Sequence, residues 1–119
     1  MKTYTIGKLF IILSIPLIFL TCNTFAEDST IDQLHDKSAI LVSQEQFNEA
    51  IRIFDQILEI DPNNVKALIN RSAVLITIGE NEKGISDTDR ILTIDPDNIK
   101  AFSNKGNALA NLGYYYDAI

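Results

Sequence analysis

The sequence ILEIDPNNVKA at residues 57–67 recurs 34 residues later as ILTIDPDNIKA at residues 91–101. The correspondence continues to Gly79 and Gly113, and eleven of the 23 compared positions are identical. Ordinary amino-acid frequencies would give about one or two identities by chance. The chain is therefore predicted to be built from a 34-residue repeat.

Each period predicts two amphipathic helices. Gly79 is expected to end the first helix of the second period, because glycine readily takes the left-handed conformation found at helix C-termini. The apolar stripe of that helix lies close to helical spacing and is formed by Ala67, Leu68, Leu75 and Ile78.

The second helix of this period is predicted from about Glu80 to Ile94. Its inward side chains are expected to be Ile85, Ile91 and Leu92, and its outward ones Glu82, Lys83, Asp87 and Arg90. The joint at residues 95–98 ends it, because proline disfavours helix in the preceding residue. The same joint starts the next helix, with proline in its first turn and Asp or Asn as its cap. The first period repeats this scheme with Leu34, Leu41, Phe47, Ala50, Ile51, Phe54, Ile57 and Leu58.

These features resemble the tetratricopeptide repeat family, which shares the 34-residue period, the helix–turn–helix unit and the Asp-Pro-Asn-Asn joint. The resemblance covers residues 31–119, as two units (31–64 and 65–98) and an incomplete third (99–119). Ala50, Phe54, Gly106, Ala118 and residues 111–115 fit the family pattern. The resemblance implies an all-α solenoid of antiparallel helix pairs.

Four positions depart from that pattern. Gly84 replaces the usual alanine, Thr88 replaces the usual aromatic residue, and Ser38 and Ser72 stand where glycine is frequent. Glycine inside a helix costs about 0.5–1 kcal/mol relative to alanine. The second unit is therefore predicted to be somewhat loose.

Residues 1–26 have the pattern of a signal peptide: two lysines by residue 8, an apolar run over 9–20, and small residues at Thr24 and Ala26. Cleavage is predicted after Ala26, which gives a secreted or extracytoplasmic protein. Residues 27–30 then form a short polar segment before the repeats.

Two other readings of this segment remain open. Residues 9–25 could act as an uncleaved membrane anchor, although a stable span needs about 20 apolar residues. Cys22 could carry a lipid, although Thr21 fits poorly before a lipidated cysteine. A membrane partner is expected only in these two cases.

Composition excludes several classes of function. Residues 27–119 keep 8 of the 10 basic residues and all 16 acidic ones, so their net charge is −8 and a nucleic-acid partner is not expected. One cysteine and one histidine cannot make a Cys/His metal site. No nucleophile–base pair or phosphate loop can be assembled, so neither catalysis nor a cofactor is expected.

The resemblance implies that the first helix of each unit lines a concave face that binds an extended peptide or a partner helix. The side chains expected on this face are small, apolar, amide-bearing or cationic. Those predicted to bind the partner are His35, Lys66, Ile69, Asn70, Ala73, Thr77, Lys100, Ser103, Asn104, Asn107 and Asn111, and the same face includes Asp32, Ala39 and Val42.

A more specific version of the family binds a C-terminal carboxylate of chaperones with lysine, arginine and asparagine. Asn70 and Lys100 match that pattern, whereas His35, Ala39 and Asn104 stand where other residues are required. This version is therefore excluded.

Three smaller motifs are assigned structural roles. The Asp87-Thr88-Asp89 sequence is interpreted as a solvated helix face because no calcium loop follows it. The glycosylation sequon Asn70-Arg71-Ser72 falls inside a predicted helix rather than a loop. His35 has no cysteine or histidine partner and is predicted to be exposed.

The sequence thus predicts an exported scaffold for protein–protein interaction. One alternative is that residues 1–119 are the N-terminal piece of a larger exported protein with its activity further on. The other is self-assembly as a homo-oligomer through the third unit, whose Leu109, Leu112, Tyr114–Tyr116 and Ile119 would be left partly exposed.

Overall fold

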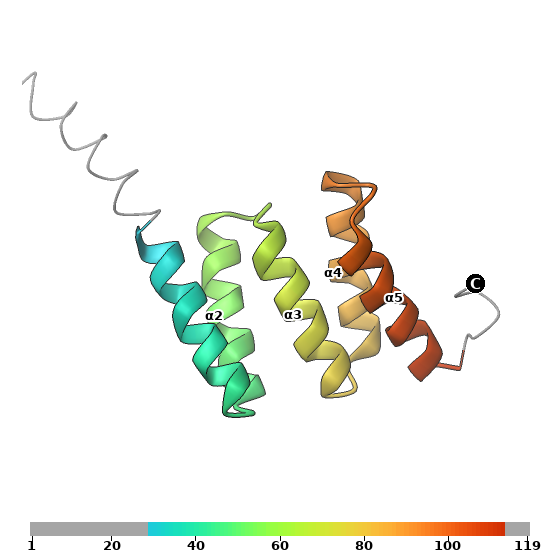
Figure 1. The fold of residues 1–119 in the computed structure, drawn as a ribbon, viewed down its shortest axis with the longest axis horizontal. Helices are drawn as coiled ribbons and strands as arrows, with labels where there is room; N and C mark the ends of the chain where they lie inside the picture. The colour runs from blue at the N-terminus through green and yellow to red at the C-terminus, as the bar shows by residue number, and fades with distance from the viewer. Residues whose placement is uncertain (1–28, 114–119) are drawn as a thin grey trace, which may run out of the picture. The chain divides into compact units, whose positions relative to one another are not determined.

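The computed structural model describes residues 29–113, and these residues form helices joined by short turns, with no strand among them. A first helix runs over residues 29–43. It is followed by α2 (Phe47–Ile60), α3 (Val65–Thr77), α4 (Asn81–Ile94) and α5 (Ile99–Asn111) (Figure 1). The predicted all-α class is confirmed. The predicted signal peptide with Cys22, and the segment from Tyr114 to Ile119, lie outside the described residues.

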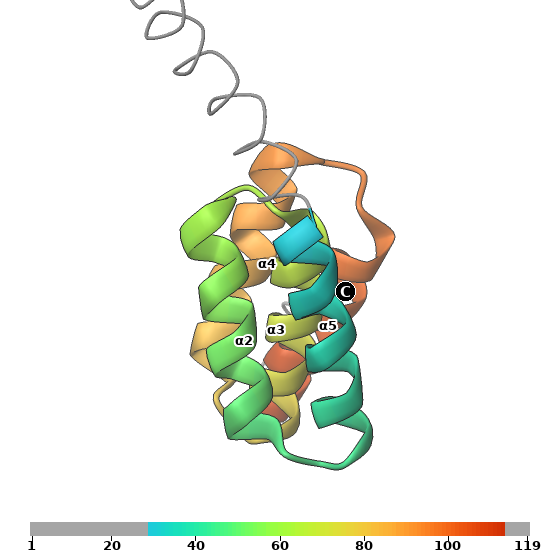
Figure 2. The same ribbon diagram turned by 90° about the vertical axis from the view of Figure 1, so that its left-hand side faces the viewer.

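Contacts divide the chain after Asp32, and the unit described here begins at Gln33. Within it, α3 packs against α2, α4 and α5, and α4 also packs against α5. Figure 2 shows α2 and α4 together on one side of this unit, with α3 and α5 on the other. We call residues 33–43, α3 and α5 the A helices, and α2 and α4 the B helices.

The joint before each later A helix has the same chemistry in both copies. The backbone N–H of Asn64 donates to the carbonyl of Asp61 at 3.1 Å, and Pro62 occupies the second position of this turn, which its fixed φ favours. The side-chain oxygen of Asn64 caps α3 by accepting from the backbone N–H of Ala67 at 2.9 Å. Asn98 caps α5 in the same way through Ala101.

The cap assignment is confirmed, but the predicted place of the proline is wrong. Pro62 and Pro96 lie before the capping asparagine rather than in the first helical turn. A proline that shapes the turn leaves the cap position to a residue with a side-chain acceptor.

The turns between A and B helices need a residue with positive φ. Gly79 has φ +89° after α3, as the sequence predicts. The backbone N–H of Glu80 donates to the carbonyl of Leu75, and that of Gly79 donates to Ile76, so two carbonyls at the end of α3 are satisfied. The first turn makes the same bonds, yet its left-handed residue is Glu45, with φ +57°.

The core lies between the A and B helices. Its largest fully buried side chains include Phe54, Ile57, Leu68 and Ile91. Burying one such side chain contributes about 1.5–3 kcal/mol, so these residues hold the two layers together. Ile78 was expected in the apolar stripe but is exposed, because it caps α3 where the chain turns away from the core.

Gly84 corrects the expectation of a loose second unit. A Cβ built at this position would lie 2.6 Å from Cγ1 of Ile76 and 3.3 Å from the carbonyl oxygen of Ser72. The missing side chain therefore allows α3 and α4 to approach closely, and the second unit is tightly packed at this point.

None of the helices within residues 29–113 is both long enough and apolar enough to cross a membrane.

Candidate functional site: the A-helix face

The predicted binding residues follow one side of α3 and the matching side of α5. On α3 they are Lys66, Asn70, Ala73 and Thr77, whose spacing of four, three and four residues aligns them along the helix. The corresponding residues of α5 are Lys100, Asn104, Asn107 and Asn111. We call the surface formed by the A helices the A-helix face.

A groove of about 290 Å³ opens between the first two A helices. Ala73 is exposed, Asn70 is partly buried beside it, and Phe54 of α2 forms part of the lining. The remaining lining comes from Ser38, Ala39, Val42 and Val74. Four predicted face residues, Ala39, Val42, Asn70 and Ala73, thus lie together around one depression.

The matching position on α5 has a different role. Nδ2 of Asn104 donates to Oγ of Ser72 at 3.0 Å and to the carbonyl of Ile69 at 3.4 Å. These bonds tie α5 to α3. Asn70 occupies the same place in its repeat, and no such bond from its side chain is formed to the preceding A helix.

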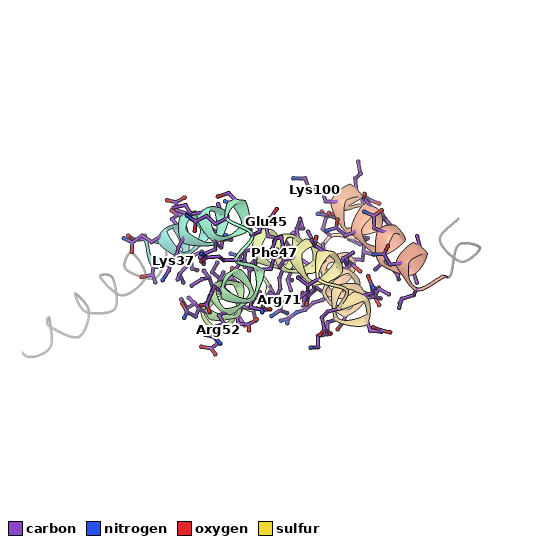
Figure 3. All side chains as sticks on the ribbon, turned by 90° about the horizontal axis from the view of Figure 1, so that it is seen from below. Lys37, Glu45, Phe47, Arg52, Arg71 and Lys100 are labelled. Atoms are coloured by element: carbon purple, nitrogen blue, oxygen red, sulfur yellow. The ribbon has the colours of Figure 1, made fainter. Side chains whose placement is uncertain are left out.

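Further along α5, Nδ2 of Asn111 donates to Oδ1 of Asn81 on α4 at 3.1 Å. Ser103 and Asn107 are exposed, as are Lys100 on α5 and Lys66 on α3. Figure 3 shows the Lys100 side chain extending away from the body of the repeats. Two predicted binding amides, Asn104 and Asn111, therefore also join helices within the chain, while the two lysines extend into solvent.

His35 is buried, with 7% of its surface exposed, so its predicted exposure is wrong. The 34-residue frame places His35 at the position that Ile69 takes in the next unit, which is partly buried between helices. Comparison of these two positions is the signal that would have predicted its burial. As an element of the binding face, His35 offers little surface to a partner.

The sequence interpretation of Asp87 and Thr88 as a solvated face is also wrong, since both are buried. Nε and Nη2 of Arg71 donate to the two carboxylate oxygens of Asp87 at 2.8 and 2.7 Å. Nη1 of Arg71 donates to Asp55 at 2.8 Å. One guanidinium thereby joins α2, α3 and α4 (Figure 3).

The hydrogen bond to Asp87 raises the pKa of Arg71, while burial acts in the opposite direction. The guanidinium thus stays charged wherever the protein is folded. The sequence contains a signal for this network, because Asp55 and Arg71 are 16 residues apart, and so are Asp89 and Lys105, the residues 34 positions later. Nζ of Lys105 and Oδ1 of Asp89 form an ion pair at 2.7 Å.

The described residues also bear on the glycosylation sequon and on metal binding. Ser72 of the Asn70-Arg71-Ser72 sequon is completely buried within α3, and its Oγ donates to the carbonyl of Ile69. Across residues 29–113, no three His, Cys, Asp or Glu side chains are grouped so that they could hold a metal ion.

Comparison with known proteins agrees with this geometry. The family profile described as tetratricopeptide repeat matches residues 41–103. A search of curated protein sequences returned no match.

Several solved structures are similar. The Sgt2 TPR domain from Aspergillus fumigatus is 30% identical, with a TM-score of 0.70, 74% of this chain covered and 58% of that chain. The second TPR of Spaghetti (RPAP3), bound to the HSP90 peptide SRMEEVD, is 21% identical, with a TM-score of 0.71 and coverage of 78% and 88%. MamA from Desulfovibrio magneticus RS-1 is 19% identical, with a TM-score of 0.71 and coverage of 75% and 50%.

This chain therefore spans little more than half the length of the Sgt2 chain and half that of MamA. Since the profile matches more than half of its residues, and the repeats, joints and helix pairs agree with that match, the chain belongs to the tetratricopeptide repeat family.

Proposed function

We propose that this protein is an interaction scaffold whose A-helix face binds an extended, acidic peptide of a partner protein. The observation that carries this proposal is the groove between the first two A helices, with the amide of Asn70 at its side. The proposal includes no catalytic step and no cofactor.

The amide of Asn70 supplies the polar contact. Among the described residues it has no hydrogen-bond partner, whereas the equivalent Asn104 is engaged with Ser72. An asparagine side chain offers both donors and acceptors, and a peptide backbone offers the same in return. The small side chains of Ala39 and Ala73 allow that backbone to come close.

Charge favours an acidic ligand. The A helices carry five lysine or arginine residues and a single acidic residue, Asp36. Arg71 and Lys105 are paired with carboxylates of the B helices. Lys66 and Lys100 are exposed and have no ion pair within the described part of the chain, so they are available to a ligand carboxylate.

The comparisons support peptide binding in general terms. Two Spaghetti TPR structures contain the HSP90 peptide SRMEEVD, in which three of the last four residues are acidic. Because these relatives are less than 25% identical, they support the fold, and the ligand of this chain is proposed from its own residues. His35, Ala39 and Asn104 still argue against the chaperone carboxylate site.

The test is a binding titration with fluorescent peptides selected from a random acidic library. We expect Lys66→Glu with Lys100→Glu to weaken binding at least about tenfold, since each lost ion pair becomes a repulsion. Lys83→Glu with Arg90→Glu is the matched control, because it makes the same charge change on α4. Equal losses in both double variants would reject the A-helix face as the site.

Asn70→Ala provides a second test that leaves the charge unchanged. We expect a loss of about fivefold, which corresponds to one hydrogen bond of about 1 kcal/mol. An unchanged affinity would remove Asn70 from the site.

We also propose that the protein is exported, on the strength of the signal-peptide pattern in residues 1–26. The intact mass of the protein from its native host tests this. A soluble species beginning at Glu27 supports export with cleavage after Ala26. A species that keeps residues 1–26 in membranes would support the anchor, and a lipid on Cys22 the lipoprotein.

The same mass measurement tests whether the repeats belong to a longer protein. A mass greater than that of residues 27–119 would make them the docking module of a larger exported protein. The activity would then be sought in the additional sequence.

Self-assembly is a second candidate function because α5 exposes two large apolar side chains. Ile99 is 82% exposed and Phe102 54%, whereas Leu68, which corresponds to Phe102, is completely buried. We expect Phe102→Asp to abolish any concentration-dependent increase of mass in analytical ultracentrifugation. A constant monomer mass in the unmodified protein would reject this candidate.

A further inference from the structure

The opposite surface, formed by α2 and α4, contains a larger groove of about 490 Å³. Arg71 and Leu75 reach it from α3, and Figure 3 shows Arg71 between α2 and α4, on the side opposite Lys100. Its lining includes charged side chains, Asp55, Glu80 and Lys83, and apolar ones, Ile51 and Ile78. We call it the B-helix groove.

The cations of the groove are already paired. Arg71 donates three hydrogen bonds to Asp55 and Asp87, and Lys83 lies 3.4 Å from Oε2 of Glu80. Three carboxylates face two cations, so the groove has a net negative charge.

In two of these carboxylates, those of Asp55 and Glu80, only one of the two oxygens has a partner. The side chain of Asp55 is 51% exposed, and only its Oδ1 accepts a bond from Arg71. The side chain of Glu80 is 49% exposed, and only its Oε2 approaches Lys83. The second oxygen of each has no partner within the described part of the chain, so the groove presents acceptors to a ligand.

The rest of the lining includes an apolar strip. Ile51 is partly buried, Leu75 is buried, and Ile78 is exposed at the end of α3. A ligand that matches both parts has a cationic group for Asp55 and Glu80 and an aliphatic group for Ile51 and Ile78.

The charge of the whole layer fits the same ligand. The B helices carry six acidic and three basic residues, the reverse of the A helices. A basic segment is therefore attracted to this side of the molecule and repelled by the other.

We propose that the B-helix groove is a second docking surface, which binds a basic segment of a partner protein through an arginine or lysine next to a leucine or isoleucine. It lies on the other side of the repeats from the A-helix face and does not depend on the function proposed there. Together the two surfaces would let one chain hold an acidic and a basic partner at once.

The test uses blocked pentapeptides with a central arginine between two leucines, titrated into the ¹⁵N-labelled full chain. We expect saturable shifts of backbone amides around Ile51, Ile78 and Ser86, and none with glutamate in place of arginine. Replacing both leucines by alanine should also weaken the shifts. Shifts that do not saturate, that fall on α5, or that are absent would overturn the proposal.

Variants of opposite sign separate this groove from general attraction. Asp55→Asn with Glu80→Gln should weaken binding about fivefold, the effect of about one exposed ion pair. Lys83→Gln should strengthen binding about twofold, because it releases Glu80. Glu49→Gln with Glu59→Gln is the control, since it removes the same charge from α2 outside the groove.

The control should bind within about twofold of the unmodified chain, because screened charges outside the groove contribute little. An equal loss in both double variants would overturn the proposal. If Asp55→Asn with Glu80→Gln fails to fold, Lys83→Gln alone decides, and unchanged or weaker binding in that variant would overturn it.

Discussion

The two complete repeats fill the same 34-residue frame with different chemistry. Where the first repeat has Ile53 and Phe54 in α2, the second has Asp87 and Thr88 in α4, and all four are buried. The first repeat thus packs aliphatic and aromatic side chains at these positions, while the second buries a carboxylate held by Arg71. The 34-residue period thus determines the path of the backbone, whereas the side chains that fill each interface between helices differ from one repeat to the next.

The largest effect is expected from Asp87→Ala. It would leave the guanidinium of Arg71, whose side chain is only 22% exposed, with Asp55 alone, and breaking such a buried pair costs about 3–5 kcal/mol. Urea unfolding followed by far-UV circular dichroism measures the free energy of unfolding. Asp55→Ala is the control and should cost less than about 1 kcal/mol, because its carboxylate is half exposed.

At the same position, the buried ion pair of the second repeat can be replaced by the apolar packing of the first. Asp87→Ile with Arg71→Lys gives the second repeat the residues of the first, which has Lys37 and Ile53 there. We expect this double variant to recover at least half of the stability lost in Asp87→Ala, since apolar residues can replace a buried ion pair at little net cost. No recovery would show that the second repeat needs the ion pair itself.

The next effect concerns Gly84 and Ile76, where the first repeat has Ala50 and Val42. Gly84→Ala should lower the free energy of unfolding by about 1–2 kcal/mol, because overpacking against Ile76 outweighs the better helix propensity of alanine. Adding Ile76→Val should restore only part of it, because valine lacks the Cδ1 that lies 3.2 Å from the new Cβ but keeps γ carbons like the Cγ1 that lies 2.6 Å from it. Thermal and urea unfolding of the single and double variants measure this coupling, and stabilisation by Gly84→Ala alone would contradict it.

A smaller effect distinguishes the two asparagines of the A-helix face. Asn104→Ala should lower the free energy of unfolding by about 1 kcal/mol, because it breaks the bonds to Ser72 and Ile69. Asn70→Ala should leave it within about 0.5 kcal/mol, since no such bond is lost. Equal destabilisation by both would mean that Asn70 is as structural as Asn104.

The smallest effect is expected at the turn into each B helix. Glu45→Gly should raise the free energy of unfolding by about 0.5–1 kcal/mol. Glycine removes the steric cost of positive φ, and its larger loss of conformational entropy on folding offsets part of that gain. Gly79→Ala is the matched change at the equivalent turn and should destabilise by about 1 kcal/mol. A destabilising Glu45→Gly would show that the glutamate side chain matters more than its φ.

The sequence predicted those parts of the fold that depend on neighbouring residues. The cap at Asn98 and the positive φ of Gly79 each follow from the residue itself and from bonds within a few positions. The helix pairs follow from the apolar period. These local preferences act in the same way in every repeat, so one sequence shows them directly.

The details of the binding faces depend on residues far apart in the chain. Asn104 contacts Ser72 across 32 positions, and Arg71 contacts Asp87 across 16. A charged residue on a helix is normally exposed. Asp87 is buried because α3 and α4 pack closely there, which brings Arg71 within hydrogen-bond distance of it. The burial of His35 differs in this respect, because its alignment with Ile69 in the 34-residue frame indicates it from the sequence.

The joint at residues 61–64 and 95–98 has a consequence for lengthening the protein by additional repeats. Both copies make the same turn and the same cap, and the helix that follows each joint begins with a β-branched residue, Val65 or Ile99. A duplicate of residues 65–98 inserted after Asn98 would therefore have the same turn and the same asparagine cap at both of its ends. Since stacked repeats contact mainly their neighbours, the array could be lengthened by whole units without redesigning the ones that are already present.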